Sequence, residues 1–256
     1  MSRYRIGITE AGDAGIDLSW VHKMSTVDGA ILITKNLTPE FCSEIKDREN
    51  VILHATITGY GGTLIEPNVP MWRNELDTLY NLVMSGFPSS RVVVRIDPII
   101  PTKEGLNLAY QVFQASINTG FRRFRVSIVD MYRHARERFL SAGIKLPYDE
   151  RFSPYGGQVC AVDSMLSTMK QYVLSVASNE ISGFNPLRIE ACAEPDLTEA
   201  IQCGCISDFD LKLLGLSPCF DSVGFQRRDC LCYSGKVELL NSKSQCPNGC
   251  LYCYWR

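Results

Sequence analysis

Two similar stretches, Arg91-Val-Val-Val-Arg-Ile-Asp97 and Arg123-Phe-Arg-Val-Ser-Ile-Val129, flank the segment Lys103–Thr119, which is followed by Gly120. The outer two stretches are rich in β-branched residues, which favour strands. The middle stretch has the length of a helix and ends at a glycine, a residue common just past helix ends. A strand, a helix and a second strand in this order indicate parallel strands joined by a crossover.

The same alternation runs through almost the whole chain. Further strands are predicted at Tyr4–Thr9, Gly29–Thr34, Val51–Thr58, Arg188–Ala193 and Asp221–Phe225. Helices are predicted from Thr38-Pro39 onward and at Met71–Ser85, Asp130–Ala142, Val162–Ala177 and Asp208–Leu214. Repeated units of this kind predict an α/β fold, a (β/α) TIM-like or partial parallel barrel. We assign residues 1–225 to the barrel body and 226–256 to a cysteine-rich tail that completes the same domain.

Composition excludes little. The chain has 256 residues, 45% hydrophobic and 21% charged, with a net charge of −2, so overall charge gives no reason to expect nucleic acid or a membrane surface. No signal peptide or membrane span is predicted, and we expect a cytoplasmic protein. In that compartment its 11 cysteines would stay reduced, and clustered ones become metal or redox candidates.

The tail contains the closest grouping of candidate metal-binding residues in the sequence. Cys246-Pro-Asn-Gly-Cys250-Leu-Tyr-Cys253 places three cysteines in the order C-x3-C-x2-C, with Pro247 blocking a helix and Gly249 allowing a tight loop. Three thiolates from one loop predict a metal centre with one coordination position open. Lys236–Leu240, just before this loop, is predicted to be one more strand.

Polar side chains near the predicted strand ends are candidate active-site residues, because barrel active sites lie at the carboxyl ends of the strands. Arg95 and Asp97 share one face of a strand, as do Glu190 and Glu194. Catalytic roles and an interior ion-pair network remain equally open for these four residues. Gly61 and Gly62 are candidate cofactor-binding glycines, although no Lys-Ser/Thr pair follows to make a phosphate-binding loop.

Two other groups admit a plain and a functional interpretation. Cys192, Cys205, Cys230 and Cys232 could form a second metal site, but their spacing is irregular and we favour core cysteines. The arginines at positions 133, 136 and 138 could bind a phosphate-bearing substrate, but we favour pairing with nearby acids.

The tail motif C-P-x-G-C-x-Y-C-Y resembles the cysteine motif of the radical S-adenosylmethionine superfamily, in particular that of the spore photoproduct lyase type. Most of the chain is also similar to an uncharacterised bacterial domain-of-unknown-function family regarded as radical-SAM-like. The segments that carry this second resemblance are Val27–Gly29 to Thr34–Asn36, Thr58–Gly61, Glu66–Pro70, Arg95–Pro98, Ser127 to Asp130–Tyr132, Ile189–Cys192, Gln226-Arg227 and Cys230 with Cys232.

The resemblance implies that Cys246, Cys250 and Cys253 hold a [4Fe–4S] cluster whose fourth iron binds S-adenosylmethionine. An electron donor would then trigger cleavage of that cofactor to a radical that attacks a substrate. Tyr252 would lie near the adenine, and Glu10 near the amino group of the cofactor. In the superfamily the motif normally follows the first barrel strand, so its place at the end of this chain implies a circular permutation. In that permutation Lys236–Leu240 acts as the first strand and the tail segment closes against the N-terminal strand Tyr4–Thr9.

Two alternatives stay open at this point. In the first, the tail cysteines, with or without Cys230 and Cys232, bind Zn²⁺ on a barrel that binds or acts on nucleic acid. In the second, an iron–sulfur cluster on the same tail cysteines has only a structural or redox-sensing role. The substrate is not identified by the sequence.

Overall fold

The computed structural model describes residues 4–147, 187–195, 197–217, 223–224, 231–233, 235–241 and 246–255, with the single positions 167, 171 and 175. Apart from those three positions, the predicted helix Val162–Ala177 lies outside the described residues. So do Cys230 and the segment Gln226-Arg227.

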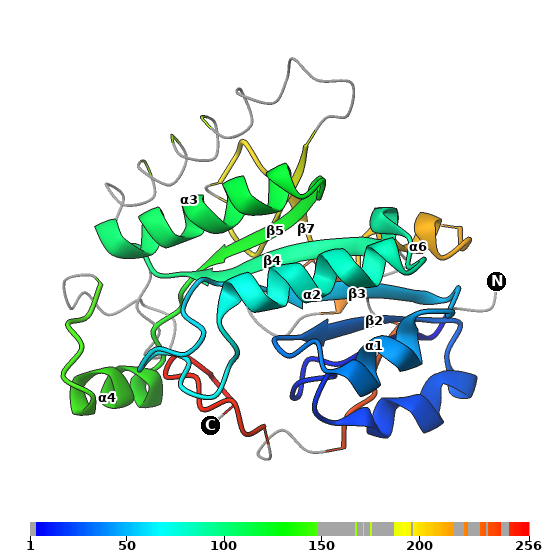
Figure 1. The fold of residues 1–256 in the computed structure, drawn as a ribbon, viewed down its shortest axis with the longest axis horizontal. Coiled ribbons are helices and arrows are strands. Elements are labelled where there is room, and N and C mark those ends of the chain that lie inside the picture. Colours follow the sequence, from blue (N-terminus) through cyan, green and yellow to red (C-terminus); the bar gives the residue numbers. More distant parts are fainter. Residues whose placement is uncertain are drawn as a thin grey trace.

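Eight strands form one parallel sheet in the order β10-β1-β2-β3-β4-β5-β6-β7. The strands are β1 (Ile6–Ile8), β2 (Gly29–Thr34), β3 (Val51–Thr56), β4 (Val92–Ile99), β5 (Arg123–Ile128), β6 (Arg188–Cys192), β7 (Ile201–Cys203) and β10 (Lys236–Glu238). The sheet curves into a half-barrel, which confirms the predicted partial parallel barrel (Figure 1).

The two ends of the chain meet in this sheet. β10 pairs with β1 in parallel, with Ile6 opposite Lys236 and Ile8 opposite Glu238. The strand predicted before the tail therefore lies beside the N-terminal strand, as expected. Parallel strands put their carboxyl ends at one edge of a sheet, so the tail leaves the sheet at the same edge as the loop after β1.

The last part of the predicted strand order is wrong in one respect. Val223–Gly224, the described part of the predicted strand Asp221–Phe225, forms β8, which pairs antiparallel with β9 (Cys232–Tyr233) outside the main sheet. The sheet instead continues with β7. Its sequence Ile-Gln-Cys is too short for the alternation of apolar and polar residues in a strand to be recognised.

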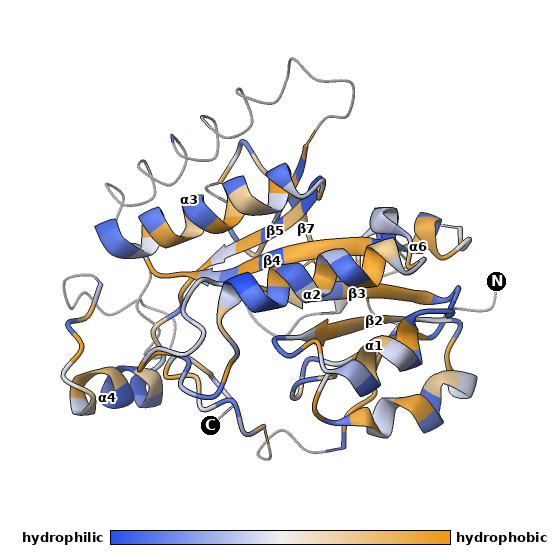
Figure 2. Ribbon diagram, in the orientation of Figure 1, coloured by the Kyte–Doolittle hydropathy of each residue, from blue (hydrophilic) through white to orange (hydrophobic). Residues whose placement is uncertain are grey.

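Three helices cover one face of the sheet (Figure 1). They are α1 (Pro39–Ile45), α2 (Trp72–Met84) and α3 (Lys103–Asn118). Thr38 and Thr102 cap the first and third of these helices, and their side-chain oxygens accept from Phe41 N and Gly105 N at 3.2 and 3.0 Å. Figure 2 shows the mostly hydrophobic strands β2, β3 and β4 behind these helices, which is where the main core lies.

Within the described residues, no layer of crossover helices covers the opposite face of the sheet. The short helix α6 (Asp208–Leu213) begins with a capping box between Ser207 and Asp210, as its sequence predicts. Leu211 of α6 and Tyr233 of β9 pack there on isoleucines of β1, β2 and β3. This face is therefore closed at its base and open toward the carboxyl ends of the strands.

The remaining helices are peripheral. They are the 3₁₀ segments η1 (Leu18–Thr26) and η2 (Ser89–Arg91) and the helix α4 (Arg133–Ser141). No helix in the described part of the chain is both long and apolar enough to cross a membrane.

Candidate metal centre and its cavity

A cavity of about 570 Å³ opens at the carboxyl ends of the strands. Its walls come from the ends of β1 to β6, the residues after β7, β9 and the last residues of the chain. We call residues 246–255 the tail loop. Its three cysteines, Cys246, Cys250 and Cys253, all line the cavity. The predicted metal ligands therefore face the same space as the strand ends.

Local sequence explains the shape of the tail loop. Gly249 has φ +72°, a backbone conformation in which a side chain would be strained. Asn248 and Cys250 on either side of it are buried, and Cys246 and Cys253 are half-buried. The glycine lets the chain reverse between the first two cysteines, so that their side chains can turn toward one cavity.

Asp13, in the loop after β1, anchors the first half of the tail loop. Its carboxylate accepts from Asn248 Nδ2 at 2.7 Å and from Asn36 Nδ2 at 2.9 Å. Asn36 Nδ2 also donates to Asn248 Oδ1 at 2.9 Å, which closes a buried triangle of three side chains. Sequence reasoning missed Asp13 and Asn248, because a single acid in a loop and an amide between cysteines carry no recognisable spacing.

Glu66, in the loop after β3, anchors the second half. Its buried carboxylate accepts from Lys35 Nζ at 2.9 Å, from Thr58 Oγ1 at 2.8 Å and from the hydroxyl of Tyr252. Lys35 also lies 5.4 Å from the centre of the Tyr252 ring, a cation–π distance. Tyr252 does line the cavity, in a position fixed by this ion pair.

Gly61 and Gly62 shape the loop that carries Glu66. Gly61 pairs with Glu66 in an isolated bridge, and a Cβ at Gly61 would lie 1.9 Å from Pro70 O. Gly62 has φ +76° and donates its N–H to Glu66 O at 3.1 Å. Neither glycine lines the cavity, so the structure gives them a role in presenting Glu66.

Arg138 of α4 holds the end of the tail loop. Its Nε donates to Leu251 O at 2.9 Å, and its guanidinium also donates to Cys253 O. Figure 1 shows the tail loop beside α4 and the loop after β3. Arg133, by contrast, pairs with Glu137 at 3.2 Å on the exposed side of the helix. Arg138, one of the arginines considered for phosphate binding, therefore donates hydrogen bonds to the backbone of the tail loop.

Two of the tail thiols, Cys246 and Cys250, have raised pKa values. Burial raises the pKa of Cys250 to about 12, even though Lys35 opposes the shift. Burial also raises the pKa of Cys246. Burial therefore favours the protonated form of both thiols.

Arg95 and Asp97 lie near the end of β4. They form an ion pair with each other, and Ser127 Oγ donates to the second oxygen of Asp97. All three side chains line the cavity. The structure thus places this predicted pair in the cavity that the tail loop faces.

Glu190 and Glu194 have other surroundings. Glu190 is fully buried and accepts from Arg125 at 2.7 Å, from Arg188 at 2.7 Å and from Arg123. These cations hold its pKa near 2 despite its burial. Glu194 accepts from Ile128 N at 2.8 Å. Neither carboxylate lines the cavity, and the ion-pair interpretation weighed from the sequence describes Glu190.

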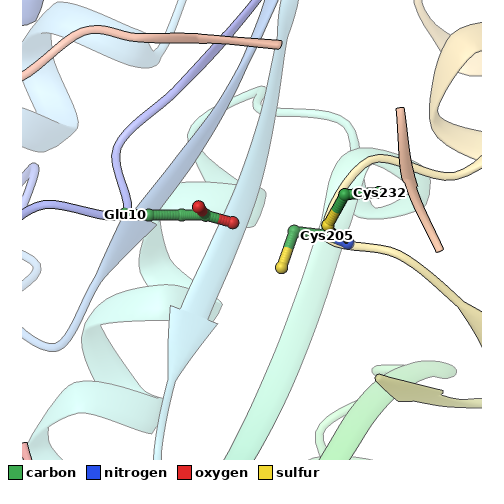
Figure 3. A group of neighbouring side chains, drawn as sticks. All are labelled: Glu10, Cys205 and Cys232. Atoms are coloured by element: carbon green, nitrogen blue, oxygen red, sulfur yellow. Dashed lines mark hydrogen bonds between the residues drawn. The ribbon is translucent and has the colours of Figure 1, made fainter. Parts of the chain in front are cut away.

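A second group of potential ligands, from the residues after β1, after β7 and on β9, lines the same cavity. Glu10, Cys205 and Cys232 bring one carboxylate oxygen and two sulfurs within 4.8 Å of one another (Figure 3). Cys192 Sγ lies 3.9 Å from Cys205 Sγ. Of the four cysteines considered for a second metal site, the three within the described residues are therefore neighbours, and they line the cavity. Cys192 and Cys232 are buried and Cys205 packs against the core, as expected for core cysteines, and two of them, Cys205 and Cys232, also belong to a group that could hold a metal ion.

Electrostatics in this group differ from those of the tail loop. Hydrogen bonds with Cys192 and Cys232 hold the pKa of the Cys205 thiol well below its ordinary value. Burial and the negative charge of Cys205 raise the pKa of Glu10 to about 8, against the effect of Lys236, whose Nζ lies 2.8 Å from Glu10 Oε2. Glu10 therefore sits between a thiolate and an ammonium group.

Comparison with known proteins gives a family and no more. No curated protein and no solved structure matches the chain significantly. One family model matches residues 17–255, which include β2 to β10 and the tail loop. Because that match spans nearly the whole chain, the protein belongs to the family described as "Domain of unknown function (DUF1848)".

Proposed function

We propose that this protein is a radical-SAM-like iron–sulfur enzyme whose tail loop holds a [4Fe–4S] cluster on Cys246, Cys250 and Cys253. The observation that carries the proposal is the place of the tail loop. Its three thiols are pinned to a cavity at the carboxyl ends of parallel strands, where barrel enzymes carry their active sites.

The separation of the tail sulfurs favours a cluster over a single ion. A lone Zn²⁺ sits about 2.3 Å from each thiolate and needs sulfurs roughly 3.8 Å apart. Cys246, Cys250 and Cys253, all described, are not among the groups whose ligand atoms lie within 4.8 Å of one another. A cubane accepts wider spacing, because each thiolate binds a different iron.

The loop architecture also supports the proposal. Asp13, Glu66 and Arg138 fix the loop at its beginning, middle and end, so the three thiols are held before any metal arrives. Preorganised ligands are what a metal centre with an open position requires.

With the cluster and S-adenosylmethionine bound, one electron from an external donor would break a sulfonium C–S bond, giving methionine and a 5′-deoxyadenosyl radical that takes a hydrogen atom from the substrate. The chain itself supplies the cavity and its polar wall. Arg95, Asp97 and Ser127 would contact the substrate, because they line the part of the cavity that lies on β4 and β5. Tyr252, held by Glu66, would pack against the cofactor.

Anaerobic reconstitution with iron and sulfide tests the proposal. We expect a brown protein with about four irons per chain at the tail that releases 5′-deoxyadenosine from S-adenosylmethionine after chemical reduction. Cys250→Ala should lose the iron and the cleavage, whereas Cys42→Ala, a change in helix α1, should keep both. A colourless protein with zinc on the tail, or equal iron in the two variants, would rule the proposal out. A brown protein that never cleaves the cofactor would leave only the structural or redox-sensing alternative.

A further inference from the structure

We propose that Glu10, Cys192, Cys205 and Cys232 bind a second metal ion, a closed four-ligand Zn²⁺. We call these four residues the distributed site, because they come from four separate parts of the chain. The site does not depend on the cluster or on the activity proposed above.

The distances fit one ion. At about 2.3 Å from the metal, two thiolates of a tetrahedral zinc site lie roughly 3.8 Å apart. Cys192 Sγ and Cys205 Sγ are 3.9 Å apart. Glu10, Cys205 and Cys232 have their ligand atoms within 4.8 Å of one another, and Cys192, which lies outside that group of three, would join it by rotation of its side chain. Three thiolates and one carboxylate on a mostly buried wall are ligands that zinc accepts.

The surroundings match those of a metal–thiolate centre. Cys205 N–H donates to Cys232 Sγ at 3.3 Å, a contact that orients a thiolate and offsets part of its charge. Lys236 Nζ donates to Glu10, and Arg125 Nη1 donates to Cys205 O at 2.9 Å. These cations compensate the net negative charge of a zinc ion with four anionic ligands.

Gly204 makes the geometry possible. A Cβ on Gly204 would lie 2.5 Å from Cys232 Cα and 2.6 Å from Cys232 N. The turn after β7 therefore touches the backbone of β9 directly, and this close approach brings Cys205 next to Cys232. Only glycine permits it without moving backbone atoms.

The position of the site gives it a structural purpose. Cys192 ends β6 and Cys205 follows β7, at one side of the sheet, whereas Glu10 follows β1 near the other side. In the described chain β7 and β10 are the two edges of the sheet and do not pair with each other. An ion on the distributed site would join the two sides across the mouth of the half-barrel, where a complete barrel would use strand hydrogen bonds.

Cobalt binding tests the site without interference from the tail. The host is the full chain with Cys246, Cys250 and Cys253 all changed to Ser. We expect it to bind one Co²⁺ with thiolate charge-transfer absorption, to release it to an equivalent of Zn²⁺, and to show a higher unfolding temperature with Zn²⁺. Adding Cys205→Ser should abolish the absorption and the stabilisation, whereas adding Cys42→Ser should change neither.

Several outcomes would overturn the distributed site. They are a host without Co²⁺ absorption, equal absorption after Cys205→Ser, and iron with sulfide in place of Zn²⁺ on the host. Folding of each variant is checked by circular dichroism, and Glu10→Gln, which keeps all three thiols, should weaken Co²⁺ binding even if Cys205→Ser does not fold. The reverse variant, Cys205→Ser with the tail intact, separates the two proposals. It should still take up iron at the tail loop if the proposed function holds.

Discussion

The tail loop draws its three thiols from eight consecutive residues, whereas the distributed site draws its ligands from positions 10, 192, 205 and 232. Both groups line one cavity. The tail sulfurs are not grouped within 4.8 Å of one another, and burial raises the pKa of Cys246 and Cys250. In the proposed function each tail sulfur would bind a separate iron. In the distributed site, the ligand atoms of Glu10, Cys205 and Cys232 lie within 4.8 Å of one another, and Cys192 Sγ lies 3.9 Å from Cys205 Sγ. This spacing is the one proposed above to suit a single ion.

The two groups also depend on different supports. The tail loop has its spacing built into the chain and needs a receptor, which Asp13, Glu66 and Arg138 provide. The distributed site has no built-in spacing and needs the backbones of two segments to touch, which Gly204 permits. A change to one support should therefore disturb one group and spare the other. The following predictions test that independence.

Asp13→Ala should have the largest effect. The carboxylate accepts hydrogen bonds from five donors, and most of them are buried: Gly15 N, Thr34 Oγ1, Lys35 N, Asn36 Nδ2 and Asn248 Nδ2. Leaving several of these donors unsatisfied should cost about 4 kcal/mol of unfolding free energy, measured by urea unfolding of the metal-free protein.

The same variant should lose iron from the tail loop, because Asn248 is no longer held, and should keep Co²⁺ at the distributed site. Asp17→Ala is the matched control. That carboxylate, in the same region, accepts from Ser19 N at 2.9 Å as a helix cap, so the change should cost about 1 kcal/mol and no iron. Loss of both metals in Asp13→Ala would show that the two groups are coupled.

Glu75→Gln should change how stability depends on pH. Glu75 of α2 is buried, and its carboxylate accepts from Leu37 N at 2.8 Å. Leu37 follows Asn36, whose side chain donates to Asp13 and to Asn248 of the tail loop. Burial and the charge of Asp13 raise its pKa from 4.5 to about 7. The folded state therefore holds this proton up to about pH 7, and the stability it contributes is lost as pH rises from 4.5 through 7.

Between pH 4.5 and 8 the wild type should lose about 3 kcal/mol relative to Glu75→Gln, since one pKa unit corresponds to about 1.4 kcal/mol. Urea unfolding at several pH values measures the difference. Glu44→Gln, in the helix α1, serves as the control and should run parallel to the wild type. Parallel curves for Glu75→Gln as well would mean that Glu75 is ionised in the folded state.

Gly204→Ala should break the distributed site while leaving every ligand in place. The new Cβ would push Cys232 away from Cys205, with an overpacking cost of about 2 kcal/mol. Co²⁺ affinity at the distributed site should fall at least tenfold, and iron at the tail should stay. Gly215→Ala is the control, because Gly215 has φ +74° and open space around it. It should lose about 1 kcal/mol of stability and no Co²⁺ affinity.

Tyr252→Phe should have the smallest effect. It removes one hydrogen bond to Glu66 and keeps the ring beside Lys35, so stability should fall by about 1 kcal/mol. Iron content should be unchanged, and binding of S-adenosylmethionine should weaken by severalfold because the ring is less firmly held. Isothermal titration of the reconstituted protein measures this binding, with Tyr80→Phe on α2 as the control. Unchanged binding would remove Tyr252 from the cofactor site.

Much of the fold could be predicted from local sequence. β2 begins and ends where its pattern indicates, at Gly29 and Thr34, and the helix caps at Thr38, Thr102 and Ser207 are formed. β7 and the antiparallel pair of β8 and β9 could not be predicted, because strands of two or three residues carry too few positions for a period of two.

The tail loop could be predicted from local sequence alone, because the C-x3-C-x2-C spacing around Pro247 and Gly249 places three candidate ligands within eight consecutive residues. The pairing of β10 with β1 is expected only from the family resemblance, through the circular permutation that it implies. Only the tertiary structure decided which acids and amides hold that loop, and only it gathered Glu10, Cys192, Cys205 and Cys232. The two kinds of contact differ in the distance along the sequence between the residues that make them. Local patterns record hydrogen bonds and turns between near neighbours, whereas these contacts arise where the ends of distant strands converge at one edge of the sheet.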